Sequence, residues 1–232
     1  MDHATTPTLP ANASIFTRLR TGLHALEVLK DDPANPYYGP LLNACLDTET
    51  YAKLARIWRE GPEGRRLLDE RPTLQGRELD LGALGRLPDG TLGREFVRYF
   101  EANGIEPFIS AFPVESDVDY LSKRYRETHD LCHVITGYGT DERGEMELQA
   151  FMLGNLGLRQ AILILAISVP RQIKQQGGKG MGAYLGRLRA AYRRGRRSRE
   201  LLSVAYEQLW AQPVSVLAAL LCAPARATGS VA

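Results

Sequence analysis

The chain has 232 residues, of which 44% are apolar and 24% are charged, and its formal net charge at pH 7 is +2. This balance is typical of a globular protein and excludes a repeat array and bulk disorder. Three scattered cysteines, an odd number, argue against a disulfide framework and for a reducing compartment. The first ten residues lack the basic segment and the apolar run of a secretion signal. We therefore expect a cytoplasmic protein with one domain at residues 14–223, between mobile segments at 1–13 and 224–232.

Helical periodicity dominates the chain and strand alternation is nearly absent, so the sequence predicts an all-α, single-domain helical bundle. Apolar residues recur every three or four positions over residues 16–29 and predict a first helix, capped by Asn12 or Ser14. Two or three short helices, interrupted by a Gly-Pro pair, are expected over residues 41–71. After a connector rich in glycine and proline, the next helix is predicted over residues 92–102.

The helix predicted from about Asp117 carries the most informative pattern in the chain. Because an α-helix turns about 100° per residue, His129, Asp130 and His133 lie within an arc of about 100° on one face. The two histidines are four positions apart, which places their Cβ atoms about 5–6 Å from each other, so both imidazoles can reach one ion. Glu145 follows His133 after eleven intervening residues.

The residues between His133 and Glu145 indicate how the glutamate returns to this face. Two glycines that follow Thr136 predict the end of the helix and a reversal of the chain. Thr140 or Asp141 can cap a second helix, and the two helices would form an antiparallel hairpin. Two imidazoles and two carboxylates would then meet, a set that suits Zn, Fe, Mn or Co better than Mg or Ca.

Other interpretations of these residues stay open. A histidine pair at this spacing can also be a surface feature or two hydrogen-bonded core side chains. Cys132, at the edge of the same arc, is expected to be a small buried residue, with a thiolate ligand as the alternative. The adjacent His129 and Asp130 are similar to the metal pair of the HD-type phosphohydrolases, which also require an upstream histidine, and His24 is the plausible candidate.

The most apolar segment is residues 151–169, which contains Arg159 and Gln160 and is expected to end at Pro170. A bilayer span needs about 20 apolar residues, and because Arg159 and Gln160 interrupt this segment, we do not expect it to span a membrane. We expect a helix that is buried in the core, or one that also lines an apolar cavity beside the metal.

A basic segment follows, with seven arginines in residues 187–199. A solvated helix face is the simplest interpretation, and docking on an anionic membrane surface and nucleic-acid binding are the others. Because no recognised nucleic-acid module surrounds the segment, we expect a peripheral membrane surface and no nucleic acid as a partner.

The pattern His-Asp-x-x-His, eleven residues, Glu resembles the metal motif of the coenzyme Q (ubiquinone) biosynthesis family that is fourth in the Coq series. The flanking residues 124–127 and 144–145 are also similar to that family, as is the segment 87–93. Weaker similarity extends over residues 37–221.

The chain departs from the family at two positions. After the acidic ligand the family often has a Lys four residues on and a Glu three beyond that, where this chain has Gln149 and Met152. The difference leaves the head group of the substrate open and bears less on the metal.

The resemblance implies a metal-dependent ring decarboxylase of quinone biosynthesis, which removes the carboxylate of a polyprenylated hydroxybenzoate and couples this to oxygenation at that carbon. His129, His133 and Glu145 would bind a divalent ion, Zn before Fe, and Asp130 would be a fourth ligand or the group that orients a histidine. All four are expected to be catalytic. The expected partners are the prenylated aromatic substrate, other quinone-biosynthesis enzymes, the inner face of the cell membrane and further copies of the chain in a homo-oligomer.

Two alternatives to this enzyme remain. The protein can be a non-catalytic organiser that binds lipid intermediates and partner enzymes, with a structural metal in a closed four-ligand site. It can also be a paralogue that acts on an aromatic substrate in specialised metabolism, which the departures at Gln149 and Met152 leave open.

Overall fold

The computed structural model describes residues 9–10, 13–32, 35, 37–76, 79–107, 109, 113–176 and 180–224. The predicted mobile segments 1–13 and 224–232 fall for the most part outside these residues, and so does Asn12. Within them the fold is all-α, as predicted, and a bridge between Thr91 and Pro213 is the one β-type pairing.

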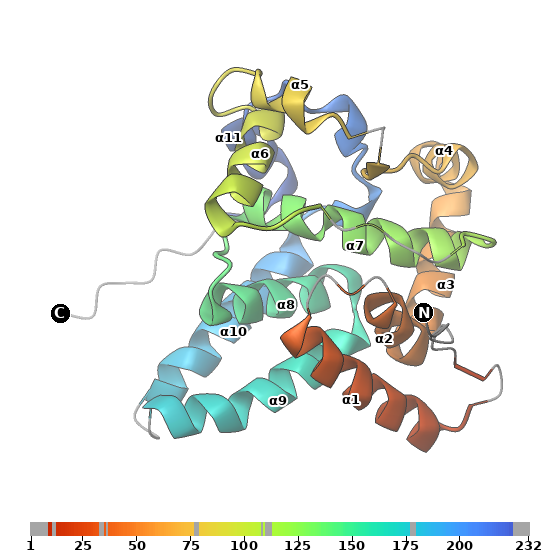
Figure 1. Ribbon diagram of the computed structural model, residues 1–232, viewed down its shortest axis with the longest axis vertical. Coiled ribbons are helices and arrows are strands. Elements are labelled where there is room, and N and C mark those ends of the chain that lie inside the picture. Colours follow the sequence, from red (N-terminus) through yellow and green to blue (C-terminus); the bar gives the residue numbers. More distant parts are fainter. Residues whose placement is uncertain are drawn as a thin grey trace, which may run out of the picture. The chain divides into compact units, whose positions relative to one another are not determined.

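The helices follow one another along the chain as labelled in Figure 1: α1 (Ile15–Asp31), α2 (Tyr38–Leu46), α3 (Thr48–Glu60), α4 (Pro62–Glu70), α5 (Leu81–Gly85), α6 (Leu92–Asn103), α7 (Asp117–Thr136), α8 (Glu142–Leu156), α9 (Arg159–Gln176), α10 (Met181–Arg197), the 3₁₀ turns η3 (Leu201–Ser203) and η4 (Tyr206–Gln208), and α11 (Val214–Leu221). The predicted helices that begin near residues 14, 92 and 117 are confirmed, and three short helices occupy residues 38–70.

Contacts group the chain into two compact units. The first comprises Met1–Asp80 and Ile105–His129, and the second comprises Leu81–Gly104 and Asp130–Ala232. The boundary falls inside α7, so this helix contributes its N-terminal part to the first unit and its C-terminal part to the second. The organisation of residues 14–223 as one domain stays a prediction.

The first unit begins with α1 packed on α2 around four buried residues, Ala25, Leu41, Leu42 and Cys45. Of the two predicted caps, Ser14 serves, because its side chain accepts a hydrogen bond from the backbone N–H of Thr17. The outer face of α1 is unusually apolar, with Phe16 81% exposed.

A cluster of Thr73, Lys123 and Glu127 lies inside the first unit, and we call it the lysine cluster. The ammonium of Lys123 lies 2.6 Å from Glu127 Oε1 and 2.5 Å from Thr73 Oγ1, and the Thr73 hydroxyl also donates to Glu127. The Glu127 side chain is fully buried. A buried carboxylate of this kind is stable only with a paired charge and hydrogen bonds, and the lysine cluster supplies both.

The second unit is organised by the close approach of α8 and α10, which lie beside each other in Figure 1. A Cβ atom on Gly154 would lie 2.2 Å from the carbonyl oxygen of Tyr192, and one on Gly195 would lie 2.1 Å from that of Phe151. Any side chain at either glycine would therefore force the helices apart. The two glycines fix how closely α8 and α10 pack.

Helix α9 differs from the prediction in where it ends and in how far it is buried. Pro170 does not end it: the helix continues to Gln176. Proline removes one backbone N–H, and because Ala166 and Pro170 are both exposed, the carbonyl that loses its partner lies in a solvent-facing part of the helix. Nor is α9 buried all round, since three of its isoleucines are about half exposed, Ile162, Ile167 and Ile173.

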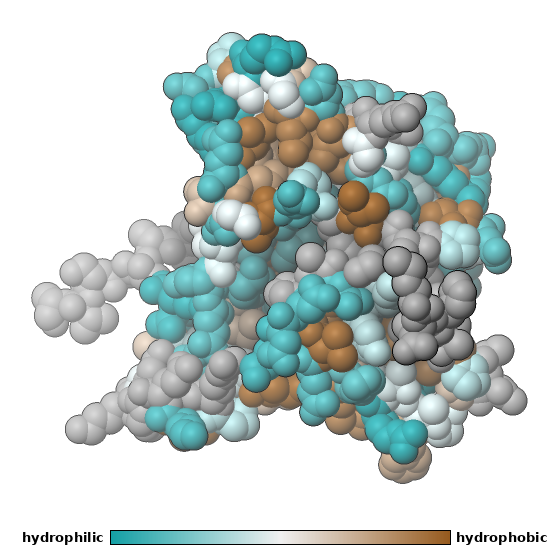
Figure 2. All heavy atoms as spheres, viewed as in Figure 1, coloured by the Kyte–Doolittle hydropathy of each residue, from teal (hydrophilic) through white to brown (hydrophobic). Residues whose placement is uncertain are grey.

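Apolar side chains also reach the surface elsewhere in the second unit. Figure 2 shows a brown area among α5, α6 and the segments next to them. Among the described residues, no helix is both long enough and apolar enough to cross a membrane.

Candidate metal centre

Helix α7 places His129 and His133 one turn apart, as the sequence predicts. His133 is buried, with 2% of its surface exposed, and His129 is half-buried. Because both side chains come from one continuous helix, their spacing is set by helix geometry alone.

Glu145 enters from the first turn of α8. Of the two predicted caps, Asp141 is the one used: its Oδ1 accepts a hydrogen bond of 2.8 Å from the N–H of Gly144. A Cβ atom on Gly144 would lie 2.1 Å from the carbonyl oxygen of Gly139, so only glycine allows a turn this tight. The turn therefore fixes where Glu145 begins. Whether α7 and α8 form an antiparallel hairpin stays a prediction.

His129, His133 and Glu145 offer ligand atoms that all lie within 4.8 Å of one another, and we call these residues the metal set. His133 Nε2 lies 3.1 Å from Glu145 Oε1. Two imidazole nitrogens and a carboxylate oxygen are the donors that Zn and Fe take in proteins, so the residues present fit such an ion.

His133 is held in one orientation by its second nitrogen. Nδ1 lies 3.0 Å from the carbonyl oxygen of Tyr138. Because a carbonyl oxygen can only accept a hydrogen bond, Nδ1 carries the proton and donates it. With the proton on Nδ1, the lone pair of neutral His133 lies on Nε2 and faces Glu145. Burial lowers the pKa of His133, but Glu145, through its hydrogen bond and its charge, together with the Tyr138 carbonyl, raises it above its ordinary value. A cation bound by the metal set would replace that extra proton.

Tyr99 of α6 lies against the same helix face. Its ring stacks on that of His133, with centroids 5.6 Å apart and planes inclined by 27°. Its hydroxyl donates to Asp130 Oδ1 at 3.3 Å. Burial, followed by the charges of Asp130 and Glu145, raises the pKa of Tyr99 far above its ordinary value, so the hydroxyl keeps its proton and remains a donor.

Arg194 of α10 braces the turn that carries Tyr138. Its guanidinium donates to the carbonyl oxygens of Thr136 at 2.8 Å and Ala223 at 2.9 Å. It also lies 5.3 Å from the centre of the Tyr138 ring. The chain of contacts therefore runs from α10 through Tyr138 to His133.

The sequence profile of the coenzyme Q (ubiquinone) biosynthesis protein Coq4 family matches residues 36–222 of this chain. The chain belongs to that family.

Curated members of the Coq4 family agree with this assignment. The zebrafish (Danio rerio) protein, named ubiquinone biosynthesis protein COQ4 homolog, mitochondrial, is 36% identical over 189 residues, which cover 79% of this chain and 69% of the relative. The human protein of the same name is 32% identical, over 79% of this chain and 70% of its own length. A crystal structure of a Nostoc punctiforme protein, described as a candidate ubiquinone biosynthesis protein, superposes with a TM-score of 0.70 at 27% identity, over 88% of this chain and 95% of the other.

The remaining candidate residues of this Coq4-family chain lie outside the metal set. Asp130 is placed with Tyr99, and its role as a metal ligand stays a prediction. Cys132 is buried, as expected, and burial raises the pKa of its thiol well above its ordinary value. His24 of α1 packs against Tyr38. The two positions that depart from the family, Gln149 and Met152, are both buried in α8.

Three contributors to the site could not be found in the sequence. The carbonyl of Tyr138 carries no residue-type signal, because every residue has one. Tyr99 belongs to an aromatic run of α6 in which Phe96 and Phe100 are equally conspicuous. Arg194 reads as one more member of the basic segment. Burial was the missing information, since Arg194 is half-buried while its neighbour Arg193 is exposed.

Proposed function

We propose that this protein is a metal-dependent enzyme of ubiquinone or related quinone biosynthesis, which removes the ring carboxylate of a polyprenylated hydroxybenzoate. The observation that carries the proposal is the convergence of His129, His133 and Glu145 within 4.8 Å. Membership of the Coq4 family supplies the pathway.

His129, His133 and Glu145 would hold the divalent ion, Zn before Fe. The bound ion would supply a Lewis acid for the ring oxygen or carboxylate. Tyr138 fixes the tautomer of His133 through its carbonyl, and Tyr99 packs on the His133 ring. We assign Asp130 the orienting role, because its contact with the Tyr99 hydroxyl supports that role over direct ligation.

In the decarboxylation the bond between the ring carbon and the carboxylate breaks, CO₂ leaves, and the ring carbon keeps the electron pair until a proton takes its place. In the oxidative form O₂ accepts four electrons, two from the ring carbon and two from an external reductant. One of its oxygen atoms replaces the carboxylate on the ring and the other leaves as water. The ratio of O₂ consumed to CO₂ released separates the two forms.

The decisive experiment measures CO₂ release from a prenylated 4-hydroxybenzoate by the metal-loaded protein. Glu145→Gln should abolish turnover while the helical circular-dichroism spectrum stays unchanged. Glu142→Gln, an exposed glutamate in the same first turn of α8, is the matched control and should leave turnover unchanged. Equal turnover by Glu145→Gln and wild type would refute the catalytic assignment.

The non-catalytic organiser remains the second candidate. The surface of the second unit favours one part of that proposal, which is attachment to a membrane. Four arginines of α10 are exposed, Arg189, Arg193, Arg196 and Arg197, and α9 exposes its isoleucines. Basic and apolar side chains together suit peripheral attachment to an anionic bilayer at the inner face of the cell membrane. The homo-oligomer and the contacts with other quinone-biosynthesis enzymes stay predictions.

Liposome co-sedimentation tests the membrane contact, with Arg194 kept in every variant. Arg194 braces the turn beside His133, so replacing it would disturb the fold as well as the charge. Replacing the four exposed arginines by Gln should reduce binding to anionic vesicles, and binding by the wild type should weaken as salt rises. Undiminished co-sedimentation of that variant would exclude this face.

The third proposal, a paralogue that acts on an aromatic substrate in specialised metabolism, depends on Gln149 and Met152. A preference for a non-prenylated aromatic acid over the prenylated hydroxybenzoate, with Glu145→Gln inactive on both, would favour specialised metabolism. Turnover of the prenylated ring alone would favour quinone biosynthesis.

A further inference from the structure

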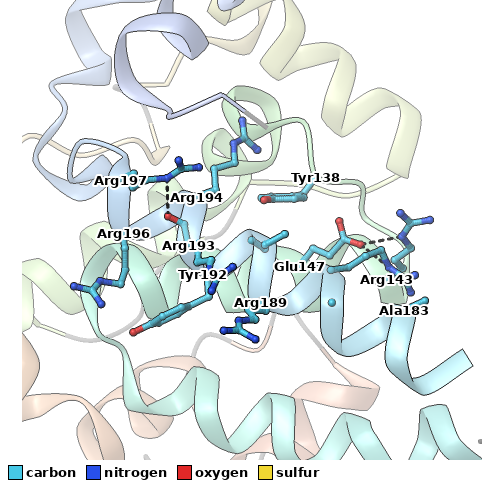
Figure 3. Close-up of a pocket in the computed structure, with 14 residues that line it drawn as sticks. Tyr138, Arg143, Glu147, Ala183, Arg189, Tyr192, Arg193, Arg194, Arg196 and Arg197 are labelled. Atoms are coloured by element: carbon cyan, nitrogen blue, oxygen red, sulfur yellow. Dashed lines mark hydrogen bonds and ion pairs between the residues drawn. The ribbon is translucent and has the colours of Figure 1, made fainter. Parts of the chain in front are cut away.

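A concave site separate from the metal set lies in the second unit, beside α8 and α10. It is a groove of about 1520 Å³ between the turn at Tyr138, the first turns of α8 and the length of α10 (Figure 3). Arg143 and Glu147 face it from α8 and are one helical turn apart. Glu145 lies two positions from each and therefore points to the other side of α8. The groove is distinct from the metal set.

The lining of the groove is strongly basic. Seven of its residues are arginines and one is acidic. That acid, Glu147, is shared by Arg143 at 2.9 Å and Arg187 at 3.1 Å, so its charge is already balanced. Within the described part of the chain, the four exposed arginines of α10 form no ion pair with a carboxylate, and Arg197 donates to the backbone carbonyl of Arg193. The groove keeps a large surplus of positive charge.

The hollow shape comes from small residues on α10. Ala183, Gly186 and Ala190 lie along the part of the helix that lines the groove, where larger side chains would fill it. A Cβ atom added to Gly186 would meet no atom within 4 Å. This concavity distinguishes the site from a basic helix face that only lies on a membrane.

We propose that this groove binds a phosphate group with two negative charges, a phosphomonoester or a diphosphate. Guanidinium groups match phosphate oxygens with two parallel hydrogen bonds, and arginine is favoured wherever such pairing is needed. Arg193 and Arg197 are exposed and one helical turn apart on α10, so both can engage one dianion. The group can belong to a lipid head group or to a soluble metabolite, and the chemistry of recognition is the same.

Isothermal titration with inorganic pyrophosphate, without added divalent metal and at fixed ionic strength, tests the proposal. We expect saturable binding of one pyrophosphate per chain to the wild type. Replacing Arg193 and Arg197 by Gln should weaken binding by about a hundredfold, because each lost hydrogen bond to a charged group costs about tenfold. Arg20→Gln with Arg56→Gln makes the same change of charge at exposed arginines of α1 and α3 and should have little effect.

Two glycine-to-leucine variants test whether pyrophosphate binds in the groove itself or only through the general positive charge of α10. Gly186→Leu fills the hollow without changing any charge, whereas Gly182→Leu places the same side chain on α10 outside the groove. Both replacements favour the helix, so neither should unfold it. Gly186→Leu should abolish pyrophosphate binding and Gly182→Leu should preserve it. Equal binding by the two variants, or no saturable binding by the wild type, would overturn the proposal.

Vesicles identify the source of the phosphate. If the group belongs to a lipid, vesicles with phosphatidic acid should bind more protein than phosphatidylglycerol vesicles of equal surface charge, and Gly186→Leu should remove that preference. If vesicles show no preference while pyrophosphate still binds, the ligand is a soluble phosphate. Titration of His133→Ala separates this site from the metal set: pyrophosphate binding should persist there, and its loss would place the anion at the metal set instead.

Discussion

Helix α7 carries two polar clusters that differ in the origin of their positive charge. The lysine cluster supplies its own cation, with the Lys123 ammonium 2.6 Å from the buried Glu127 carboxylate. The metal set, further along the same helix, brings together two imidazoles and a carboxylate, whose lone pairs converge within 4.8 Å. The first cluster holds its own ion pair, and the second is suited to a cation from outside the chain.

This difference leads to opposite expectations for mutation. Removing a member of the lysine cluster should damage the fold. Removing a member of the metal set should remove function, because a chain of this length buries enough apolar surface to fold without a metal.

The largest effect is expected for His133→Ala. The wild type should carry about one divalent ion per chain, and the variant should carry almost none, because two ligands from the metal set do not hold an ion tightly. Elemental analysis of the purified proteins measures this, with His24→Ala, an exposed histidine on α1, as the matched control. A metal-free wild type that is folded and active would refute the metal set as a functional metal site.

A large loss of stability is expected for Lys123→Met. The substitution leaves the Glu127 carboxylate buried without its cation, which should lower the free energy of unfolding by about 3 kcal/mol. Urea denaturation measures it. Adding Glu127→Leu should recover much of the loss, since the uncompensated charge is then gone.

The same denaturation series applied to Glu145→Gln sharpens the contrast. Its free energy of unfolding should change by no more than about 0.5 kcal/mol, as for a partly exposed side chain. A loss of several kcal/mol would mean that both clusters are structural, and the organiser would become the better proposal.

A smaller effect is expected for Arg194→Met. Loss of the brace at Thr136 should loosen the Tyr138 carbonyl that orients His133, and the affinity for Zn should fall by about tenfold. Competition with a chromophoric chelator measures this affinity. Arg193→Met, an exposed neighbour, serves as the control, and Arg194→Lys should restore part of the affinity. Equal affinities in all four proteins would show that Arg194 of α10 does not support metal binding.

A smaller loss of stability than that of Lys123→Met is expected at the start of α7, where Arg59 makes two hydrogen bonds of 2.8 Å to the partly exposed Asp117. The hydrogen bond from Arg59 lowers the pKa of Asp117 below its ordinary value. The folded-state pKa is thus below the unfolded one, so the pair stabilises the protein above pH about 4 and loses its effect as pH falls further. Asp117→Asn should cost about 0.5–1 kcal/mol at pH 7 and progressively less as the pH falls through the folded-state pKa, by urea denaturation at pH 7 and in acid.

The sequence predicted the parts of this molecule that depend on local periodicity. The boundaries of α7, the histidine pair and Glu145 all follow from spacing and from caps such as Asp141. What it could not predict depends on contacts between distant residues. Arg194 could not be separated from its basic neighbours, because its partners Thr136 and Ala223 are far away in sequence. The continuation of α9 through Pro170 was missed because local propensity says that proline ends a helix.

Gly154 of α8 and Gly195 of α10 restrict the number of residues that α8 can have between Glu145 and Gly154. The carbonyls of Phe151 and Tyr192 fit only opposite Gly195 and Gly154, so the two helices have one permitted register. Deleting one residue between Glu145 and Gly154 would turn Glu145 by about 100° and shift it by about 1.5 Å along the helix axis. An insertion or deletion in this stretch of α8 would therefore separate Glu145 from the two histidines.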